Sequence, residues 1–223
     1  GVPRVVTALT DQEHNGAIES SRADILEVRV DAFRNCDLAY VEDQVKRISE
    51  TGLPVILTIR NDKAEGARHC MKDAHKHEIF KAAISLVDAV DIELSSALVF
   101  DVVKLAGDNG KVVIVSSHNF KRTISDKELE VIFKRSKESG ADIVKIAMQA
   151  NTRDDVARLM AFTLAHRQDN IVTISLGRLG SISRLVLPAM GSLLTYSYIT
   201  RMSASGQLPL LKLQEDLRFY YPD

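Results

Sequence analysis

A single lysine, Lys145, interrupts an apolar run at residues 141–147 that has the composition of a buried strand. Burying an ammonium group is unfavourable, because a low dielectric favours the neutral amine. Such a lysine is therefore paired or used in chemistry, unless it lies at a strand end and its stem reaches water. A desolvated amine that stays partly neutral near pH 7 is the nucleophile required for Schiff-base chemistry on a ketone or aldehyde.

Other charged residues occur late in other predicted strands. Glu27 and Arg29 alternate with valines, so the two-residue period of a strand places both on one face. Core packing does not explain charges on one face of a buried strand, so we interpret them as part of a site. Further candidates of this kind are Arg60, Glu93 and, just past the end of its strand, His118.

These residue types suit imine chemistry. If Lys145 forms an imine with a ketone, the protonated imine withdraws electrons, and a neighbouring carbon can lose a proton to a base. His118 is the natural base because its pKa is near neutrality, and Glu93 is expected to orient its ring. Arg60 and Arg184 are candidates to bind a substrate carboxylate, and their charge is expected to lower the pKa of Lys145.

Strand-like and helix-like stretches alternate along the chain, without a linker, low-complexity tract or repeat. The predicted strands cover residues 4–8, 25–30, 55–59, 89–94, 112–116, 141–147, 171–174 and 193–198. The predicted helices cover residues 13–21, 38–48, 73–86, 95–104, 125–140, 152–164, 182–190 and 210–219. Eight strand-then-helix units predict one α/β domain, residues 1–223, folded as a (β/α)8 TIM barrel. The carboxyl ends of the strands form the catalytic face of such a barrel, where all the charged candidates would meet.

The composition narrows the function classes. With 45% hydrophobic residues in 223, the chain can bury one large core, and 29 Lys and Arg against 30 Asp and Glu leave a formal charge of -1. This balance indicates no nucleic acid or membrane-surface partner, and the apolar runs are shorter than the roughly 18 residues of a spanning helix. Two cysteines, Cys36 and Cys70, make no disulfide framework, and no secretory signal is recognised, so we expect a cytoplasmic protein.

Several motifs resemble one enzyme family. The stretch Asp91-Ile-Glu93-Leu94, followed after eighteen residues by Val113-Ile-Val-Ser116-Ser117-His118-Asn119, is similar to the signature region of type I 3-dehydroquinate dehydratases. The other similar stretches are Glu27-Val-Arg29-Val-Asp31, Thr58-Ile-Arg60, Val144-Lys145, the glycine-rich turn from Gly177 to Arg184, and the lid segment Ser203-Ala-Ser-Gly206-Gln207. The resemblance covers nearly the whole chain.

The resemblance implies dehydration of 3-dehydroquinate to 3-dehydroshikimate in the shikimate pathway, which leads to chorismate and the aromatic amino acids. By this resemblance, Lys145 forms the imine, His118 removes and returns a proton in a syn elimination, and Glu93 orients His118. The implied substrate-binding residues are Arg184, Ser203 and Gln207 at the carboxylate under the lid, and Glu27, Arg29 and Arg60 at the hydroxyls or carboxylate from below. The family also implies a homodimer, a small-molecule substrate, and neither a cofactor nor a metal.

The sequence departs from the family pattern at four positions. These are Ser117 before the histidine, Ala8 on the first strand, Ser205 in the lid, and Ala67 after Glu65-Gly66. They affect substrate positioning and lid stiffness rather than the type of reaction.

Other functions stay open from the residues alone. Another Schiff-base barrel enzyme, such as an aldolase, would share Lys145 without needing the set of Glu93, His118 and Arg184. A catalytically silent binding barrel is expected to have lost one of these residues, and a bifunctional dehydratase and dehydrogenase would need a nucleotide-binding domain with a glycine fingerprint.

Two local patterns have alternative interpretations. His69, Cys70, His75 and His77 lie close together in the sequence, but their spacing matches no strong zinc site. Gly177 and Gly180 could bind phosphate at a helix start, but we favour a tight turn that directs Arg184.

Overall fold

The structure, a computed structural model, describes residues 2–61, 63, 67, 69–200, 202 and 204–221. The strands are β1 (Arg4–Leu9), β2 (Ile25–Arg29), β3 (Val55–Thr58), β4 (Ala89–Glu93), β5 (Val112–Asn119), β6 (Ile143–Gln149), β7 (Ile171–Leu176), β8 (Leu194–Tyr198) and β9 (Leu208–Pro209). The α-helices are α1 (Asn15–Ser21), α2 (Leu38–Ser49), α3 (Asp73–Ala83), α4 (Val99–Asp108), α5 (Asp126–Glu138), α6 (Arg153–Ala165), α7 (Gly177–Gly180), α8 (Ser183–Val186) and α9 (Leu210–Tyr220). The 3-10 helices among the described residues are η1 (Val30–Ala32), η3 (Ile84–Leu86) and η4 (Leu187–Met190).

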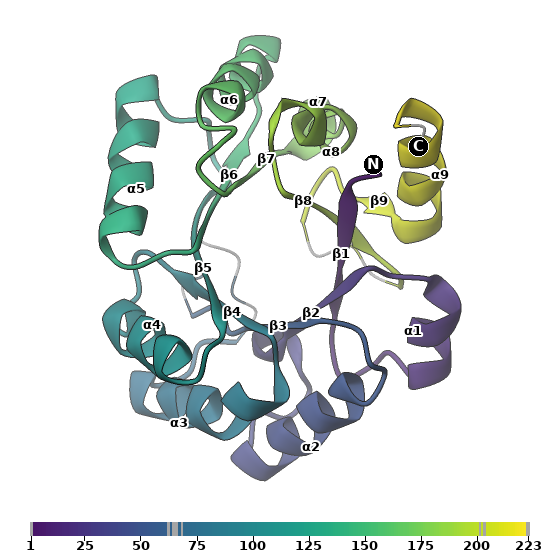
Figure 1. Cartoon of the computed structure of the whole chain (residues 1–223), viewed down its shortest axis with the longest axis vertical. Coiled ribbons are helices and arrows are strands. Elements are labelled where there is room, and N and C mark those ends of the chain that lie inside the picture. Colours follow the sequence, from purple (N-terminus) through teal and green to yellow (C-terminus); the bar gives the residue numbers. More distant parts are fainter. Residues whose placement is uncertain are drawn as a thin grey trace.

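The strands form a curled, parallel sheet surrounded by the helices. Their order is β7-β6-β5-β4-β3-β2-β1-β8-β9, and every neighbouring pair is parallel. Figure 1 looks along the ring of strands, with α1 to α6 and α9 around its outside. This arrangement confirms the predicted α/β fold of the TIM-barrel type, because each helix returns the chain to the start of the next parallel strand.

The ring meets at a seam between β7 and β8, which are not neighbours in the hydrogen-bonded order. The backbone N–H of Leu193 donates to the carbonyl oxygen of Ile171 across 2.9 Å. The hydroxyl of Ser192 accepts from the N–H of Thr173 at 3.1 Å and donates to the carbonyl of Leu194 at 3.1 Å. A loop serine therefore supplies part of the bonding that a strand ladder provides elsewhere.

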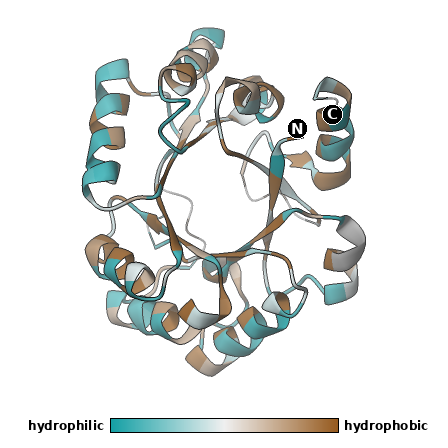
Figure 2. Ribbon diagram, viewed as in Figure 1, coloured by the Kyte–Doolittle hydropathy of each residue, from teal (hydrophilic) through white to brown (hydrophobic). Residues whose placement is uncertain are grey.

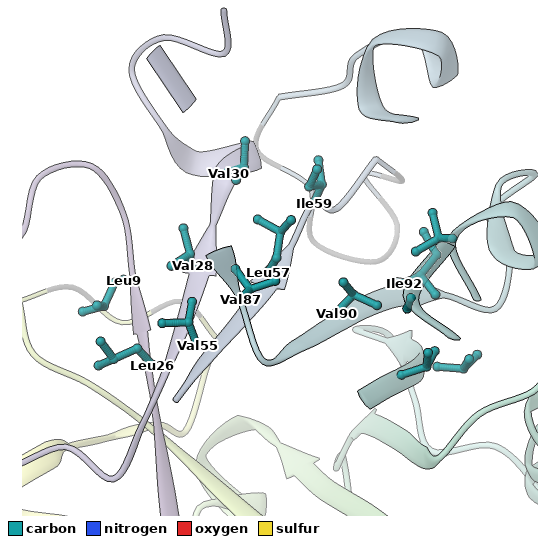
Figure 3. Close-up of a cluster of buried hydrophobic side chains, with 14 of the residues drawn as sticks. Leu9, Leu26, Val28, Val30, Val55, Leu57, Ile59, Val87, Val90 and Ile92 are labelled. Atoms are coloured by element: carbon teal, nitrogen blue, oxygen red, sulfur yellow. The ribbon is translucent and has the colours of Figure 1, made fainter. Parts of the chain in front are cut away.

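Alternation along the strands divides the core into two layers. On β6, Val144 and Ile146 belong to the large cluster between the strands and the helices, whereas Ala147 belongs to the cluster inside the barrel. Figure 3 shows part of the outer layer, and Figure 2 shows polar residues on the outer sides of the helices. Because side chains alternate along a strand, Lys145 must face the barrel interior.

Two predicted helix starts are confirmed by their caps. The Ser125 hydroxyl accepts from the backbone N–H of Glu128, whose carboxylate accepts from the N–H of Ser125, and Thr152 and Asp155 form the same box before α6. Each satisfied cap typically adds about 1 kcal/mol to helix stability.

The strand boundaries correct one expectation for the site. His118 does not follow its strand but lies within β5, which continues to Asn119. The cause is the length of β6, which pairs Met148 with Asn119. The histidine therefore has a rigid backbone. The short elements β9 and α7 were not predicted, because each has too few residues to show a periodicity.

Candidate active site

Lys145 lies in the middle of β6 and is buried, with 3% of its surface exposed. Its Nζ donates hydrogen bonds to Asp91 Oδ2 at 2.9 Å and to Glu27 Oε1 at 3.1 Å. The interpretation that its stem reaches water is therefore wrong. The face of the Tyr196 ring lies on another side of the amine, with Nζ 4.1 Å from the ring centroid.

These contacts also overturn the expected direction of the pKa shift of Lys145. Burial alone lowers the pKa of this amine, but the charges of Asp91 and Glu27 outweigh burial and raise the pKa above its ordinary value. Arg60 acts in the expected direction but is a smaller influence. The resting group is a paired ammonium ion, not a partly neutral amine.

Asp91, on β4, connects the lysine to the arginine expected at the site. Its Oδ1 lies 2.8 Å from Arg60 Nη2 and accepts a hydrogen bond from the Ser116 hydroxyl at 2.6 Å. Arg60 Nη1 donates to the same hydroxyl at 2.6 Å. Burial raises the pKa of Asp91, but Arg60 and Lys145 more than compensate, so its pKa lies below the ordinary value. Asp91 belongs to the family-like stretch Asp91-Ile-Glu93-Leu94, but it was not among the predicted site residues.

His118 lines the same pocket as Lys145 and is expected to be neutral at physiological pH. Burial, together with the positive charges of Arg60 and Lys145, lowers the pKa of the imidazole well below 6.5. Asp91 opposes this shift, and its charge acts on the histidine as well as on the lysine. A neutral imidazole inside a barrel can accept a proton.

Glu93 differs from the expectation that it orients His118. Its Oε1 accepts from the backbone N–H of Asn61 at 2.7 Å, and its Oε2 accepts from Nζ of Lys76 at 2.7 Å. Glu93 lines a neighbouring pocket with Asn61, outside the one that contains His118. The physical reason is its position as the last residue of β4, where it meets the loop after β3 and helix α3. Lys76 was not singled out in the sequence, because nothing there distinguishes it from a solvated helix lysine.

Arg29 and Glu27, which were also predicted to bind the substrate, are each held by contacts with neighbouring side chains. Arg29 forms a bidentate pair with Asp31, with both N to O distances 2.9 Å, and Glu27 accepts from the Thr58 hydroxyl at 3.1 Å. Burial lowers the pKa of Arg29, but Asp31 raises it further, so the guanidinium stays charged. These contacts orient Glu27 and Arg29 along the wall of the pocket.

Arg184, on α8, contrasts with these pairs. It is 2% exposed, and its Nε, Nη1 and Nη2 have no hydrogen-bond partner in the part of the chain that the structure describes. Burial lowers its pKa to about 10, so it is still a cation at neutral pH. A buried cation without an acceptor is unfavourable, and an anionic group of a ligand is the natural partner.

The segment before β9 reaches the turn that leads to Arg184. Gly177, with φ of +83°, donates its N–H to the carbonyl of Ser205 at 3.1 Å, and Gly206 has φ of +82°. A Cβ at Gly206 would collide with the carbonyl oxygen of Gly177, so glycine is required at this crossing. Gln207 lines the pocket, and its Oε1 accepts from the N–H of Ala204 at 3.1 Å. Ser203, also predicted to bind substrate, lies outside the described residues.

One pocket, with about 460 Å³ of empty space that is partly open to solvent, brings most of the predicted residues together. Its predicted members are Glu27, Arg29, Arg60, His118, Lys145, Arg184 and Gln207. Tyr196, on β8, also lines it and was not predicted. Polar groups therefore converge where the strands of a barrel end.

The described residues contain no group of three or more histidine, cysteine, aspartate or glutamate side chains arranged to hold a metal ion. His75, from the histidine-rich stretch, instead makes a hydrogen bond of 2.7 Å between its Nε2 and the carbonyl of Cys36. Within the same part of the chain, no helix has both the length and the hydropathy needed to cross a bilayer.

The fold and the position of the pocket define a class, the α/β barrels that carry their polar site at the carboxyl ends of the strands. Comparison with known proteins refines this assignment. Residues 5–223 match the family model of type I 3-dehydroquinase, and the chain belongs to that family.

Curated relatives and solved structures agree with this assignment. The chain is 37% identical over 217 residues to 3-dehydroquinate dehydratase of Hydrogenobaculum sp. (strain Y04AAS1), covering 95% of this chain and 97% of that one. It is 34% identical to the crystal structure of the same enzyme from Aquifex aeolicus VF5, with a TM-score of 0.87, covering 99% and 100% of the two chains. The type I enzyme from Clostridium difficile, solved with covalently modified comenic acid, is 27% identical with a TM-score of 0.90, covering 99% and 92%.

Proposed function

We propose that the protein is a hydro-lyase that converts 3-dehydroquinate to 3-dehydroshikimate through an imine on Lys145. The observation that carries this proposal is the inward-facing Lys145, in a chain of the type I 3-dehydroquinase family. Lys145 shares one pocket with His118 and with the guanidinium of Arg184, which has no hydrogen-bond partner among the described residues. A substrate with a ketone and a carboxylate fits this combination, because the amine attacks the ketone and Arg184 binds the carboxylate.

The first step requires Lys145 to lose its proton, since the resting amine is an ammonium ion paired with Asp91 and Glu27. His118 can accept this proton as a neutral imidazole. The free amine attacks the ketone carbon. The imidazolium of His118 then returns its proton to the carbinolamine hydroxyl, which leaves as water, so that the imine is protonated and the imidazole is neutral again. The imine carries the same positive charge as the ammonium ion, so the same two carboxylates stabilise it.

Elimination follows from the imine. His118 removes a proton from the carbon beside the imine, and the electron pair of that C–H bond neutralises the iminium to give an enamine. The enamine electrons then expel the substrate hydroxyl, which takes the proton from the imidazolium and leaves as water. Hydrolysis of the conjugated imine releases 3-dehydroshikimate and restores Lys145.

The remaining site residues have proposed binding roles. Glu27, Arg29 and Arg60 bind the substrate hydroxyls or carboxylate from below, and Gln207 and Ser203 act with Arg184 at the carboxylate. The role of Glu93 in orienting His118 stays a prediction, and its bonds to Lys76 and Asn61 support a structural role instead.

The wider context is proposed from the family. The reaction belongs to the shikimate pathway and to aromatic amino acid biosynthesis, takes place in the cytoplasm, and involves no cofactor, nucleic acid or membrane. We also propose that residues 1–223 form a single domain and that the protein acts as a homodimer. Sedimentation analysis of the purified chain tests this assembly.

Reduction with sodium borohydride tests the imine. We expect borohydride added with 3-dehydroquinate to inactivate the protein and to leave a reduced adduct on the peptide that contains Lys145, measured by mass spectrometry. The variant Lys145→Ala should form no adduct. As a control, Lys104→Ala, which removes an exposed lysine of α4, should react like the wild type. Normal turnover by a protein that borohydride leaves unmodified would reject the imine route.

A further inference from the structure

Tyr196 is a pocket residue with a hydroxyl group that has no bonding partner in the described part of the protein. It lies on β8 and is 3% exposed, and its oxygen accepts and donates no hydrogen bond there. Its ring is held by the barrel interior and by Lys145, with Nζ 4.1 Å from the ring centroid. The amine therefore lies over the ring, and the hydroxyl hydrogen of Tyr196 has no acceptor among the described residues.

Burying a hydroxyl without a partner is unfavourable, and core packing alone would favour phenylalanine at this position. Other buried hydroxyls show both cases. The hydroxyl of Ser175, on β7, is also unbonded among the described residues but does not line this pocket, whereas others are bonded. Thr7 bonds to Ser197 at 3.0 Å, and Thr163 bonds to Thr173 at 2.6 Å. A hydroxyl that the protein leaves unbonded in a ligand pocket indicates that the ligand supplies the partner.

The second unsatisfied group nearby is Arg184. Its three side-chain nitrogens also lack partners among the described residues, and Tyr196 lies close enough to raise the pKa of Arg184 against the effect of burial. A guanidinium has only donors, and a phenol that stays protonated has one. Burial raises the pKa of Tyr196, so this phenol keeps its proton across the physiological range. The two side chains therefore lack the same thing, an acceptor.

We infer that Tyr196 is a further substrate-binding residue, whose hydroxyl donates a hydrogen bond to the substrate carboxylate held by Arg184. This inference rests on the proposed function, since it takes 3-dehydroquinate as the ligand. A carboxylate offers two oxygens with several lone pairs, so it can accept from the guanidinium and the phenol together. The ring of Tyr196, lying against the amine, then fixes the distance between the carboxylate site and the carbon that Lys145 attacks.

The variant Tyr196→Phe removes the hydroxyl and keeps the ring. For a hydrogen bond to a charged group, we expect KM for 3-dehydroquinate and Kd for 3-dehydroshikimate to rise roughly ten- to a hundred-fold, with kcat changed little. The midpoint of unfolding of the free protein should not fall, because the hydroxyl hydrogen that is lost has no acceptor among the described residues. Borohydride should still trap the adduct on Lys145 at saturating substrate. Tyr40→Phe, which removes a hydroxyl bonded to Asp11 at 2.9 Å outside the pocket, is the matched control and should keep wild-type KM.

A ligand lacking the carboxylate distinguishes this role from a general effect on the pocket. We expect Tyr196→Phe to bind 3-dehydroshikimate more weakly than the wild type, but to bind an analogue with hydrogen in place of the carboxylate equally well. Equal binding of 3-dehydroshikimate by variant and wild type, or an equal loss for both ligands, would overturn the inference while leaving the imine route intact. A wild type that neither turns over 3-dehydroquinate nor forms an adduct would overturn the proposed function, and this inference with it.

Discussion

The variant Lys76→Met is expected to destabilise the protein strongly, because it leaves a buried carboxylate without its cation. Lys76 has no exposed surface, and its Nζ lies 2.7 Å from Oε2 of Glu93, which is also buried. Removing one partner of a buried ion pair costs about 3–5 kcal/mol. For a domain of this size, that loss corresponds to a fall in Tm of roughly 6–20 °C. Methionine keeps the length of the lysine stem, so the packing of α3 is perturbed little.

The double variant Lys76→Met, Glu93→Gln tests whether the charge pair is the cause. Glutamine keeps an acceptor oxygen for the N–H of Asn61, now bonded to Glu93 at 2.7 Å, and removes the unpaired charge. We therefore expect it to recover most of the stability lost by Lys76→Met, measured as the urea midpoint and Tm. Lys81→Met is the control on the same helix. Its exposed pair with Glu78 should contribute less than about 1 kcal/mol.

The same variants decide between the two roles of Glu93. If Glu93 serves only to hold α3 and the loop after β3, the double variant should keep kcat within a few-fold of the wild type. If it orients His118, glutamine should lower kcat by about a hundred-fold to ten-thousand-fold, the usual worth of general acid-base assistance. A double variant as unstable as Lys76→Met, or one with such a fall in kcat, would refute the structural role.

Three further predictions follow from the pocket. His118→Ala should still form the borohydride adduct but lose elimination by about a hundred-fold to ten-thousand-fold, and normal turnover would place the base elsewhere. The pKa of His118 lies below 6.5, and the base acts when it is deprotonated. The value of kcat/KM should therefore be constant from about pH 6.5 to 7.5 and fall only at lower pH. A fall in kcat/KM that begins above pH 6.5 would contradict this assignment. The pKa values of Asp91 and Glu27 are lower in the folded protein than in the unfolded chain, where they are near 4. The stability that these carboxylates contribute is therefore fully present above about pH 4, and it is lost as the pH falls through their pKa values in the folded protein. The urea midpoint should therefore drop below about pH 4, and less steeply in Asp91→Asn; equal slopes would show that the pairs with Lys145 contribute nothing.

Periodicity was enough to predict the fold and the direction of the key side chain. Val144 and Ile146 had to face the helices, so Lys145 had to face the interior, and the same rule placed Glu27 and Arg29 there. Periodicity does not predict which residues on non-neighbouring strands lie at the same level along the barrel axis. Lys145 reaches Glu27 and Asp91 across the barrel, from β6 to β2 and β4, so the pairs that raise its pKa depend on tertiary geometry.

The bonds of Glu93 to Lys76 and Asn61, which the sequence did not predict, have a related cause. A two-residue period puts Glu93 and Asp91 on one face of β4, but the strand ends at Glu93, where local twist and the following loop decide the direction. Tyr196 was missed for a different reason. A tyrosine in an apolar strand looks like a core residue, and only the unsatisfied hydroxyl, visible in three dimensions, distinguishes it.

The interior charges explain how a strongly paired lysine can still serve the proposed reaction. A raised pKa opposes deprotonation of Lys145, yet the positive charge does not leave the site when the imine forms, so the carboxylates of Asp91 and Glu27 keep a partner. When His118 then takes the carbon proton, the lysine nitrogen becomes neutral in the enamine and the imidazolium becomes charged. Asp91 acts electrostatically on both groups, so the positive charge moves between two positions that one fixed carboxylate stabilises. A site that instead kept its amine neutral by isolating it would have no such group to stabilise the iminium.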